Sequence, residues 1–410
     1  MCDSIENPIT QEIKLEQDIL ELKTVRVFSG TFNVSGQDVT ESLSPWLQCD
    51  YDIDIYAIGF QELDLSVEAY LVYDGTRESN WTNAVLQALG DKAADYRKNT
   101  HEETNRETVI FDLDHVKTTD RNASYSPNEK QAQYGRHSNT QSLFGNKGGV
   151  AIRFRFHDSY LCFVNCHLAA DPNGLERRNQ DYLDICQRIT FPINMSEGYS
   201  SLYGWVGDYI PPYAKNAVAG MGGMVGIIGT TPNDNKVGAG QVMPIFDNDH
   251  LIWMGDLNYR IDTLPESEVK TMLEGNNTEV LLNFDQLNIQ RHKKQAFNGF
   301  EEGKITFLPT YKYDFGTNEW DTSEKKRTPA WTDRILWRSQ NNEWCKLLRY
   351  VSHMKIALSD HKPVSAIFEL KIKKCVRDDW IILKDNECEQ HTEINKIPTD
   401  LNNTGERGEC

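Results

Sequence analysis

Apolar residues recur along the chain in short runs that are rich in β-branched and aromatic side chains. Some alternate with polar residues, as in VAIRFRF at 150–156, and turn residues such as Ser35 and Gly36 follow the first run. A period of two with flanking turn residues is typical of β-strands. The sequence therefore predicts strands at residues 25–34, 54–60, 149–156, 161–168, 251–256, 334–338 and 364–372.

Longer stretches between these runs have the pattern of helices. Residues 81–96 and 175–189 are the clearest, and the polar segment 12–23 predicts a further short helix. No internal repeat is visible in the sequence. Because strands and helices alternate irregularly, the pattern favours layered sheets flanked by helices.

Two internal stretches differ from the rest of the chain. Residues 97–145 are strongly polar around a single apolar segment at 109–116, and residues 198–245 contain ten glycines and four charged side chains. Both are interpreted as loops or insertions. One elaborated domain at 24–372 is expected between polar tails at 1–23 and 373–410.

The charge of the chain restricts its binding partners. The 410 residues carry 43 Lys and Arg against 61 Asp and Glu, a formal net charge of −18. Such a charge argues against a nucleic-acid binder that relies on its overall field, but a local basic cluster or a bound cation can still bind an anion.

Cysteine usage and the N-terminal residues bear on the compartment. The nine cysteines form no CxxC pair, as expected in a reducing environment. The first twenty residues contain acidic side chains and no apolar core, so no signal peptide is expected. No segment is apolar enough to predict a membrane span. These features predict a soluble chain in the cytoplasm.

Polar residues with useful chemistry stand where the predicted strands begin or end. Each alone is a common turn or structural residue, but their joint occurrence favours a catalytic site at one edge of the sheets. The candidates are Asn33, Glu62, His167, Asp256, Asn258, Asp333 and His361.

These side chains suit a hard cation. The sequence has no CxxC or HExxH pattern for zinc, and neither a GxxxxGK[ST] nor a GxGxxG loop for nucleotides. The glycine-rich GNKGG segment at 145–149 is only a weak phosphate signal. Oxygen and amide ligands with few carboxylates favour Mg²⁺. Together with Asp and His, they predict metal-assisted hydrolysis of a phosphoester.

A locally basic stretch lies between residues 304 and 334 of this acidic chain. A solvated charge run is the alternative, but next to a phosphoester site the cations are better interpreted as phosphate-binding groups. Its members are Lys304, Tyr311, Lys312, Lys325, Lys326 and Arg327.

The sequence blocks around these residues resemble the signatures of inositol polyphosphate 5-phosphatases, and most closely the type II branch. The blocks are FQELD at 60–64, GNKGGV at 145–150, NCHLAA at 165–170, WMGDLNYR at 253–260, PTYKYD at 309–314, RTPAWTDRILW at 327–337 and SDHKPV at 359–364. The resemblance implies membership of the endonuclease/exonuclease/phosphatase superfamily. It also implies a DNase I-like α+β fold, a four-layer α/β/β/α sandwich of two packed mixed sheets flanked by helices.

The resemblance implies a role for each catalytic candidate. It makes Glu62 a Mg²⁺ ligand with Asn33 beside it, and places His167 on a phosphoryl oxygen. Asp256 and Asn258 would position the attacking water and the scissile phosphate. His361 would pair with Asp333, and the sequence leaves open whether Asp256 or His361 is the base.

The resemblance also implies the substrate contacts. Tyr311, Lys312, Lys325 and Arg327 would bind the neighbouring 4-phosphate, and Lys147 of the glycine-rich loop would be a further contact.

Two segments depart from the family pattern. Relatives have an apolar strand before the GNKGG loop, where this chain has the polar segment 97–145, so a sheet strand is expected to be missing. Residues 198–245 form an insertion where relatives have a shorter loop.

The expected function is Mg²⁺-dependent removal of the 5-phosphate from phosphoinositides, such as the 4,5-bisphosphate and 3,4,5-trisphosphate of phosphatidylinositol, or from soluble inositol polyphosphates. The expected partners are these head groups at a membrane surface or in solution, with no nucleic acid; no protein partner is predicted. A nuclease of the same superfamily and a catalytically impaired phosphoinositide-binding protein are the alternatives.

Overall fold

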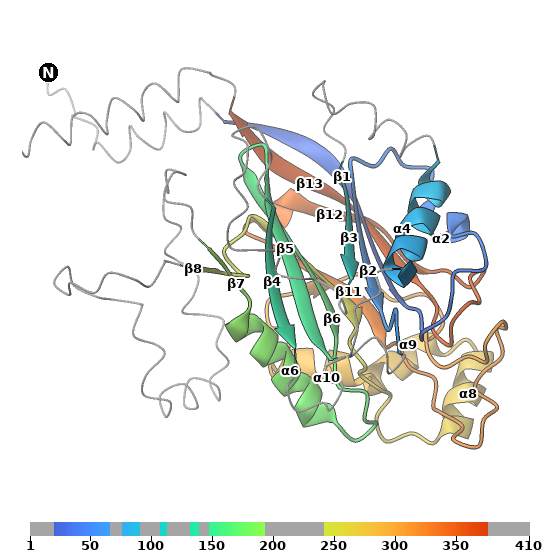
Figure 1. Cartoon of the computed structure of the whole chain (residues 1–410). Coiled ribbons are helices and arrows are strands. Elements are labelled where there is room, and N and C mark those ends of the chain that lie inside the picture. The colour runs from blue at the N-terminus through green and yellow to red at the C-terminus, as the bar shows by residue number, and fades with distance from the viewer. Residues whose placement is uncertain are drawn as a thin grey trace, which may run out of the picture.

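The computed structural model describes residues 20–65, 76–90, 107–112, 132–138, 147–192 and 242–375. Two mixed β-sheets pack face to face, and helices lie on their outer faces (Figure 1). The four-layer sandwich expected from the sequence is therefore confirmed.

The first sheet has five strands in the order β12-β13-β1-β2-β3. β1 runs parallel to β2, β2 runs parallel to β3, and β13 is antiparallel to both β1 and β12. β2 is buried along its whole length, as expected for a central parallel strand made of a continuous apolar run. The strands are β1 (Leu20–Asn33), β2 (Ile55–Gln61), β3 (Glu107–Asp112), β12 (Cys345–Ser352) and β13 (Val364–Cys375).

The second sheet has six strands in the order β10-β11-β9-β6-β5-β4. Only the β6–β9 pair is parallel, and the other neighbours are antiparallel. A two-stranded sheet of β7 and β8 accompanies it. The strands are β4 (Ala132–Ser138), β5 (Gly148–Phe156), β6 (Ser159–His167), β7 (Thr190–Pro192), β8 (Val242–Pro244), β9 (His250–Asp256), β10 (Glu301–Glu302) and β11 (Asp333–Ser339).

The helices are distributed over the two outer faces. α2 and α4 cover the first sheet, and α6 and α10 lie against the second (Figure 1). None of the helices in the described part of the chain is long and apolar enough to cross a bilayer. The helices are α2 (Ser44–Leu47), α4 (Thr76–Leu89), α6 (Leu175–Arg188), α8 (Glu266–Glu274), α9 (Thr278–Leu281) and α10 (Gln286–His292), with 3₁₀ turns at Leu282–Phe284 and Asn342–Trp344.

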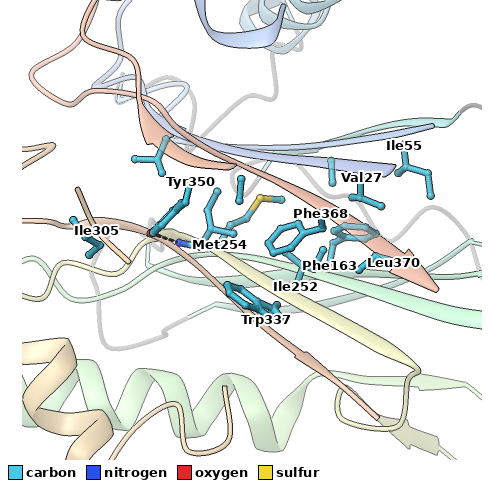
Figure 2. Packing of buried hydrophobic residues seen from close by; sticks show 14 of the residues in the cluster. Val27, Ile55, Phe163, Ile252, Met254, Ile305, Trp337, Tyr350, Phe368 and Leu370 are labelled. Carbon is cyan, nitrogen blue, oxygen red and sulfur yellow. Dashed lines mark hydrogen bonds between the residues drawn. The ribbon is translucent and has the colours of Figure 1, made fainter. Parts of the chain in front are cut away.

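Three apolar clusters fill the spaces between the layers. The central cluster joins the facing surfaces of the two sheets through residues such as Val27, Phe163, Ile252 and Phe368 (Figure 2). A second cluster, which includes Trp81, joins the first sheet to α2 and α4, and a third joins the second sheet to α6 and α10. Burial along the whole length fixes central strands such as β2 and β9 rigidly, which positions the side chains at their ends.

The structure corrects the expectation of a missing strand. The polar segment 97–145 supplies β3 at an edge of the first sheet and β4 at an edge of the second. An edge strand obtains its backbone hydrogen bonds from a single neighbour and needs no continuous apolar run, which explains why the polar composition misled the prediction.

Two further predicted segments can be compared with the structure in part. Within the segment predicted as a helix at 12–23, the described residues 20–23 are strand, because they pair with residues 372–375 of β13 in an antiparallel ribbon. Residues 198–241 of the expected insertion lie outside the described residues, and 242–244 of it form β8.

Candidate active site

The candidate catalytic residues meet at one end of both sheets. Asn33 is the last residue of β1, and Glu62 follows β2 directly. His167 and Asp256 end the parallel strands β6 and β9 as register partners, and Asp333 begins β11 opposite Asp256. The topology therefore gathers residues that lie far apart in the sequence.

The carboxylate of Asp256 lies at the centre of this group and is buried. Its Oδ2 accepts a hydrogen bond from Asn33 Nδ2 at 2.9 Å, and lies 3.3 Å from His167 Nε2 and 3.9 Å from His361 Nε2. Burial alone would raise the pKa of Asp256, but the nearby His361, His167 and Lys147 outweigh it and hold that pKa below its usual range. Asp256 is therefore an ionised carboxylate.

His361 and Asp333 form a buried pair. His361 Nδ1 lies 2.9 Å from Asp333 Oδ2, which also accepts hydrogen bonds from the hydroxyls of Thr310 at 2.6 Å and Thr332 at 2.9 Å. Burial lowers the pKa of His361, but the carboxylates of Asp333 and Asp256 more than compensate and raise it to about 10. The imidazole is thus charged at neutral pH.

The carboxylate of Glu62 lies close to His167 and Lys147. Its Oε1 lies 3.4 Å from His167 Nε2 and 3.7 Å from Lys147 Nζ, and Lys147 Nζ lies 2.5 Å from His167 Nε2. Lys147 therefore joins the catalytic group itself.

The backbone around Glu62 is fixed by α4. Glu62 adopts a φ of 56°, and its carbonyl accepts a hydrogen bond from Gly36 N at 2.7 Å. Arg77 Nη1 donates to the carbonyls of Gly36 at 2.5 Å and Leu63 at 3.4 Å. Arg77 therefore ties the turn after Asn33 to the turn that carries Glu62, a role that the sequence analysis missed.

A buried amide pair joins the two sheets beneath the site. Gln61 Nε2 donates to Asn165 Oδ1 at 2.6 Å, and Asn165 Nδ2 donates to the carbonyl of Phe60 at 3.0 Å. A Cβ atom at Gly59 would lie 2.6 Å from the Asn165 side chain, so glycine permits this close approach. Both amides stand inside the FQELD and NCHLAA blocks, which is the signal that would have found them.

Asn258 lies beside Asp256 in a strained conformation. Its φ is 55°, and its backbone N–H donates to Asp256 Oδ1 at 3.0 Å. Its side-chain Nδ2 donates to the carbonyl of Leu168 at 3.0 Å, and its Oδ1 lies 2.5 Å from Arg260 Nη2. Arg260 is a second residue of the site that the sequence analysis did not single out.

The predicted phosphate-binding residues are only partly gathered. The ring of Tyr311 lies 4.6 Å from the imidazole of His361, centroid to centroid, so Tyr311 borders the catalytic group. Lys312 Nζ donates to Asp360 Oδ2 at 2.5 Å, and the backbone N–H of Arg327 donates to Asp321 Oδ2 at 2.8 Å. Because Asp321 N also donates to the Lys312 carbonyl, this aspartate links Lys312 to Arg327.

The other members of the basic stretch lie on the surface. Lys325 and Lys326 are exposed in the turn that precedes Arg327. Lys304 forms an exposed ion pair with Glu279, so it takes part in a surface contact. The basic stretch therefore contains both residues near the catalytic group and residues on the surface.

The donor set at the strand ends fits an oxygen-liganded divalent cation. The carboxylate of Glu62 and the amide of Asn33 stand on either side of Asp256 and His167, and the Lys147 ammonium near Glu62 shows that this position attracts positive charge. Asp256, Asp333 and His361 also offer ligand atoms within 4.8 Å of one another. His361 is hydrogen-bonded to Asp333 within that second group, and Asn33 Oδ1 accepts a hydrogen bond from Ser35 N at 3.0 Å, so a bound cation would compete with an existing hydrogen bond at either position.

The comparison with known sequences identifies the family. Residues 30–367 match the family described as Endonuclease/Exonuclease/phosphatase family 2. The chain belongs to this family. Family 2 members similar to it include the mouse type II inositol 1,4,5-trisphosphate 5-phosphatase, 39% identical over 363 residues, which cover 88% of this chain and 31% of the relative.

A fission yeast relative gives the same result. The inositol-1,4,5-trisphosphate 5-phosphatase 1 of Schizosaccharomyces pombe is 30% identical over 393 residues, or 93% of this chain and 31% of the relative. The chain spans about a third of the length of these curated relatives. The resemblance to inositol polyphosphate 5-phosphatases is thus confirmed for the part that aligns.

Solved structures share the fold of this chain. The inositol polyphosphate 5-phosphatase domain of spSynaptojanin, solved with inositol (1,4)-bisphosphate and a calcium ion, has a TM-score of 0.63 and 27% identity, covering 96% of this chain and 99% of that one. A Cimex nitrophorin with a TM-score of 0.53 and 19% identity, covering 85% of this chain and 99% of that one, shares the fold alone.

Proposed function

We propose that this chain is a Mg²⁺-dependent phosphatase that removes the 5-phosphate from phosphoinositides, such as phosphatidylinositol 4,5-bisphosphate and 3,4,5-trisphosphate, and from soluble inositol polyphosphates. The observation that carries the proposal is the buried Asp256 carboxylate between His167 and His361, at 3.3 and 3.9 Å. A carboxylate flanked by two imidazoles suits the attack of water on a phosphate ester and the stabilisation of the charge that develops.

The relatives support the choice of phosphate. The spSynaptojanin domain was solved with inositol (1,4)-bisphosphate, and the mouse relative is named a 1,4,5-trisphosphate 5-phosphatase. The bisphosphate is what remains when the trisphosphate loses its 5-phosphate. We infer the same regiochemistry for this chain.

The roles of the catalytic side chains follow from their contacts. Asp256 would orient the attacking water and accept its proton, because it is ionised at the centre of the site. The donors around it lower its pKa and make it a weak base. Little basicity is needed when the transition state of phosphoryl transfer is loose. His361 is held charged between Asp256 and Asp333, so it stabilises the negative charge that develops on the phosphoryl group, while Asp333 orients its ring.

His167 and Asn258 complete the binding of the scissile phosphate. His167 Nε2 faces both Asp256 and Glu62, where it can donate to a phosphoryl oxygen. Asn258, whose backbone N–H donates to Asp256, would donate a side-chain amide N–H to another phosphoryl oxygen.

Glu62 and Asn33 would hold the cation. Mg²⁺ fits because it accepts one or two carboxylates and shares its remaining positions with water and substrate oxygens. When bound, it would polarise a phosphoryl oxygen and offset the negative charge of the site.

The basic residues would recognise the rest of the head group. Lys312, Lys325 and Arg327 would bind the 4-phosphate with Tyr311, and Lys147 would reach the substrate from the loop beside Glu62. Arg327 has the planar donor set that can contact a phosphate through two N–H groups. We further propose that the catalytic domain corresponds to residues 24–372 and acts in the cytoplasm, at the membrane surface when its substrate is a lipid.

A phosphate-release assay with Mg²⁺ tests the proposal. It compares phosphatidylinositol 4,5-bisphosphate vesicles with soluble inositol 1,4,5-trisphosphate, and uses the His361→Ala variant as the inactive control. Single-stranded DNA is followed separately on a denaturing gel, because cleavage of a phosphodiester releases no inorganic phosphate. We expect release from at least one inositol substrate and cleavage of none of the DNA. DNA cleavage would favour a nuclease, and vesicle binding without phosphate release would favour an impaired lipid-binding protein.

A further inference from the structure

The side chain of Arg260 connects three parts of the proposed active site. Its Nη2 donates to Asn258 Oδ1 at 2.5 Å and to the carbonyl of Ala170 at 3.1 Å, and its Nε donates to the carbonyl of Asn258 at 3.1 Å. Its guanidinium carbon lies 4.6 Å from the centre of the Tyr311 ring. One planar group thus contacts the loops that follow β6 and β9 and the residue that borders His361.

These contacts determine how the Asn258 amide is oriented. Its oxygen faces the guanidinium of Arg260, and its nitrogen donates to the carbonyl of Leu168 at 3.0 Å. A flipped amide would place N–H groups against the guanidinium and an oxygen against a carbonyl, and both contacts would be repulsive. With its oxygen engaged in this way, the Asn258 amide has one further N–H that a bound phosphate could accept.

The backbone of Arg260 is fixed by Gln286 and Arg178. Its backbone N–H donates to Gln286 Oε1 at 3.0 Å, and the same oxygen accepts a hydrogen bond from the buried Arg178 at 2.8 Å. Arg178 also donates to the carbonyls of Ala169 and Asp171, on either side of the Ala170 carbonyl that Arg260 contacts. The loop after β6 and the backbone of Arg260 therefore form one rigid unit.

We propose that Arg260 is a positioning residue, which fixes the amide of Asn258 as a hydrogen-bond donor to the scissile phosphate and couples it to Tyr311. The inference rests on the proposed function for its substrate and on the contacts above for its geometry. Arg260 acts through Asn258 and Tyr311, and no contact between Arg260 and the substrate is required.

A double-mutant cycle on soluble inositol 1,4,5-trisphosphate tests this role. Arg260→Ala is expected to lower kcat about 10- to 100-fold with a smaller change in KM, because a misplaced group near the reacting atoms costs up to about 10²-fold. In the Asn258→Ala background, the same change should cost less than about threefold. Arg260→Lys keeps the charge without the planar donors and should restore only part of the activity.

The controls separate positioning from other effects. Arg26→Ala removes a partly exposed arginine that pairs with Glu369 on the first sheet, and it should leave kcat unchanged. A loss from Arg260→Ala that is equally large with and without Asn258 would place Arg260 directly on the substrate and overturn the proposal.

A second measurement needs no activity. The side-chain amide signals of Asn258 in an ¹⁵N-labelled protein, assigned by their loss in Asn258→Asp, should shift and exchange faster with water in Arg260→Ala. Unchanged signals would overturn the proposed contact. If the wild type releases no phosphate from any inositol substrate, the proposed function fails, and the amide signals still decide the role of Arg260.

Discussion

Asp333 and Asp256 are cross-strand partners at the adjoining ends of β11 and β9. Two carboxylates opposite one another on antiparallel strands repel, which would destabilise the pair if nothing lay between them. The imidazole of His361 occupies that position, with Nδ1 at 2.9 Å from Asp333 and Nε2 at 3.9 Å from Asp256. The strand register thus brings two carboxylates together, which favours a positive charge between them, and the charged imidazole of His361 lies there.

The first prediction concerns this pair. His361→Ala and Asp333→Asn should each lower kcat by about 10²-fold or more, because one removes the charged group and the other its partner. If the two act as a unit, the double variant should be little worse than the worse single variant. Steady-state kinetics on the soluble trisphosphate measure this, with Asp158→Asn in the β5–β6 turn as the control. Losses that multiply in full would show that the residues act separately.

The second prediction concerns the cation. Glu62→Gln should weaken Mg²⁺ binding by about tenfold or more, because a neutral amide is a poorer ligand than a carboxylate. Isothermal titration of Mg²⁺ measures the affinity directly, and the activity at saturating Mg²⁺ gives a second readout. Glu279→Gln, which changes the same functional group at the exposed pair with Lys304, is the control. Wild-type affinity in Glu62→Gln would remove Glu62 from the metal site.

The third prediction concerns the neighbouring phosphate. A charge-assisted contact from Arg327 is worth about 1.5–3 kcal/mol, or roughly 10- to 150-fold in kcat/KM. Arg327→Ala should lose this factor on a 4,5-bisphosphate substrate and much less on one with a 5-phosphate alone. The ratio of the two losses cancels any general damage to the fold, and Lys304→Ala controls for the change in charge. Equal losses on both substrates would contradict the assignment.

The fourth prediction separates stability from catalysis. His353 Nδ1 lies 3.0 Å from the carbonyl of Pro45, a contact that raises the pKa of His353, and its Nε2 lies 2.7 Å from the hydroxyl of Ser365. Burial is the main cause that lowers the pKa of His353 to about 4. In the unfolded state this imidazole binds a proton near pH 6.5. The contribution of the neutral His353 to the free energy of unfolding is therefore complete above that pH and is lost as the pH falls towards 4.

Urea unfolding as a function of pH measures the effect. At pH 5 the loss from His353 should be about 2 kcal/mol, so His353→Gln should show a shallower fall in stability between pH 7 and 5 than the wild type. The exposed His292→Gln should keep the wild-type slope. The same slope in both variants would show that His353 is not the group that titrates.

The sequence predicted the buried strands more accurately than the edges. Continuous apolar runs mark β2 and β9, which are buried along their whole length. The edge strands β3, β4 and β12 have short or interrupted apolar runs, because each of them pairs with a single neighbouring strand. Their pairing depends on the rest of the sheet, which local patterns do not encode.

The site residues were predicted from their places at strand ends and, except for Asn33, from the motif blocks, but their contacts were not predicted. His361 and Asp333 are 28 residues apart in the sequence. They meet because Asp333 begins β11 of one sheet, His361 precedes β13 of the other, and the two sheets pack together. Arg77 was missed because it acts on backbone oxygens and lies outside every block. Arg260 ends the WMGDLNYR block, but the block does not show that its side chain contacts Asn258 and Tyr311. Lys304 was included because local charge alone cannot distinguish a surface pair from a phosphate contact.

The identity of the product tests the central claim most directly. Purified wild-type protein is incubated with Mg²⁺ and soluble inositol 1,4,5-trisphosphate, and the bisphosphate formed is identified by ³¹P NMR or by chromatography against positional standards. The account predicts inositol 1,4-bisphosphate, formed at a much lower rate by His361→Ala. Formation of the 1,5- or 4,5-bisphosphate, or the same rate in the variant, would contradict it.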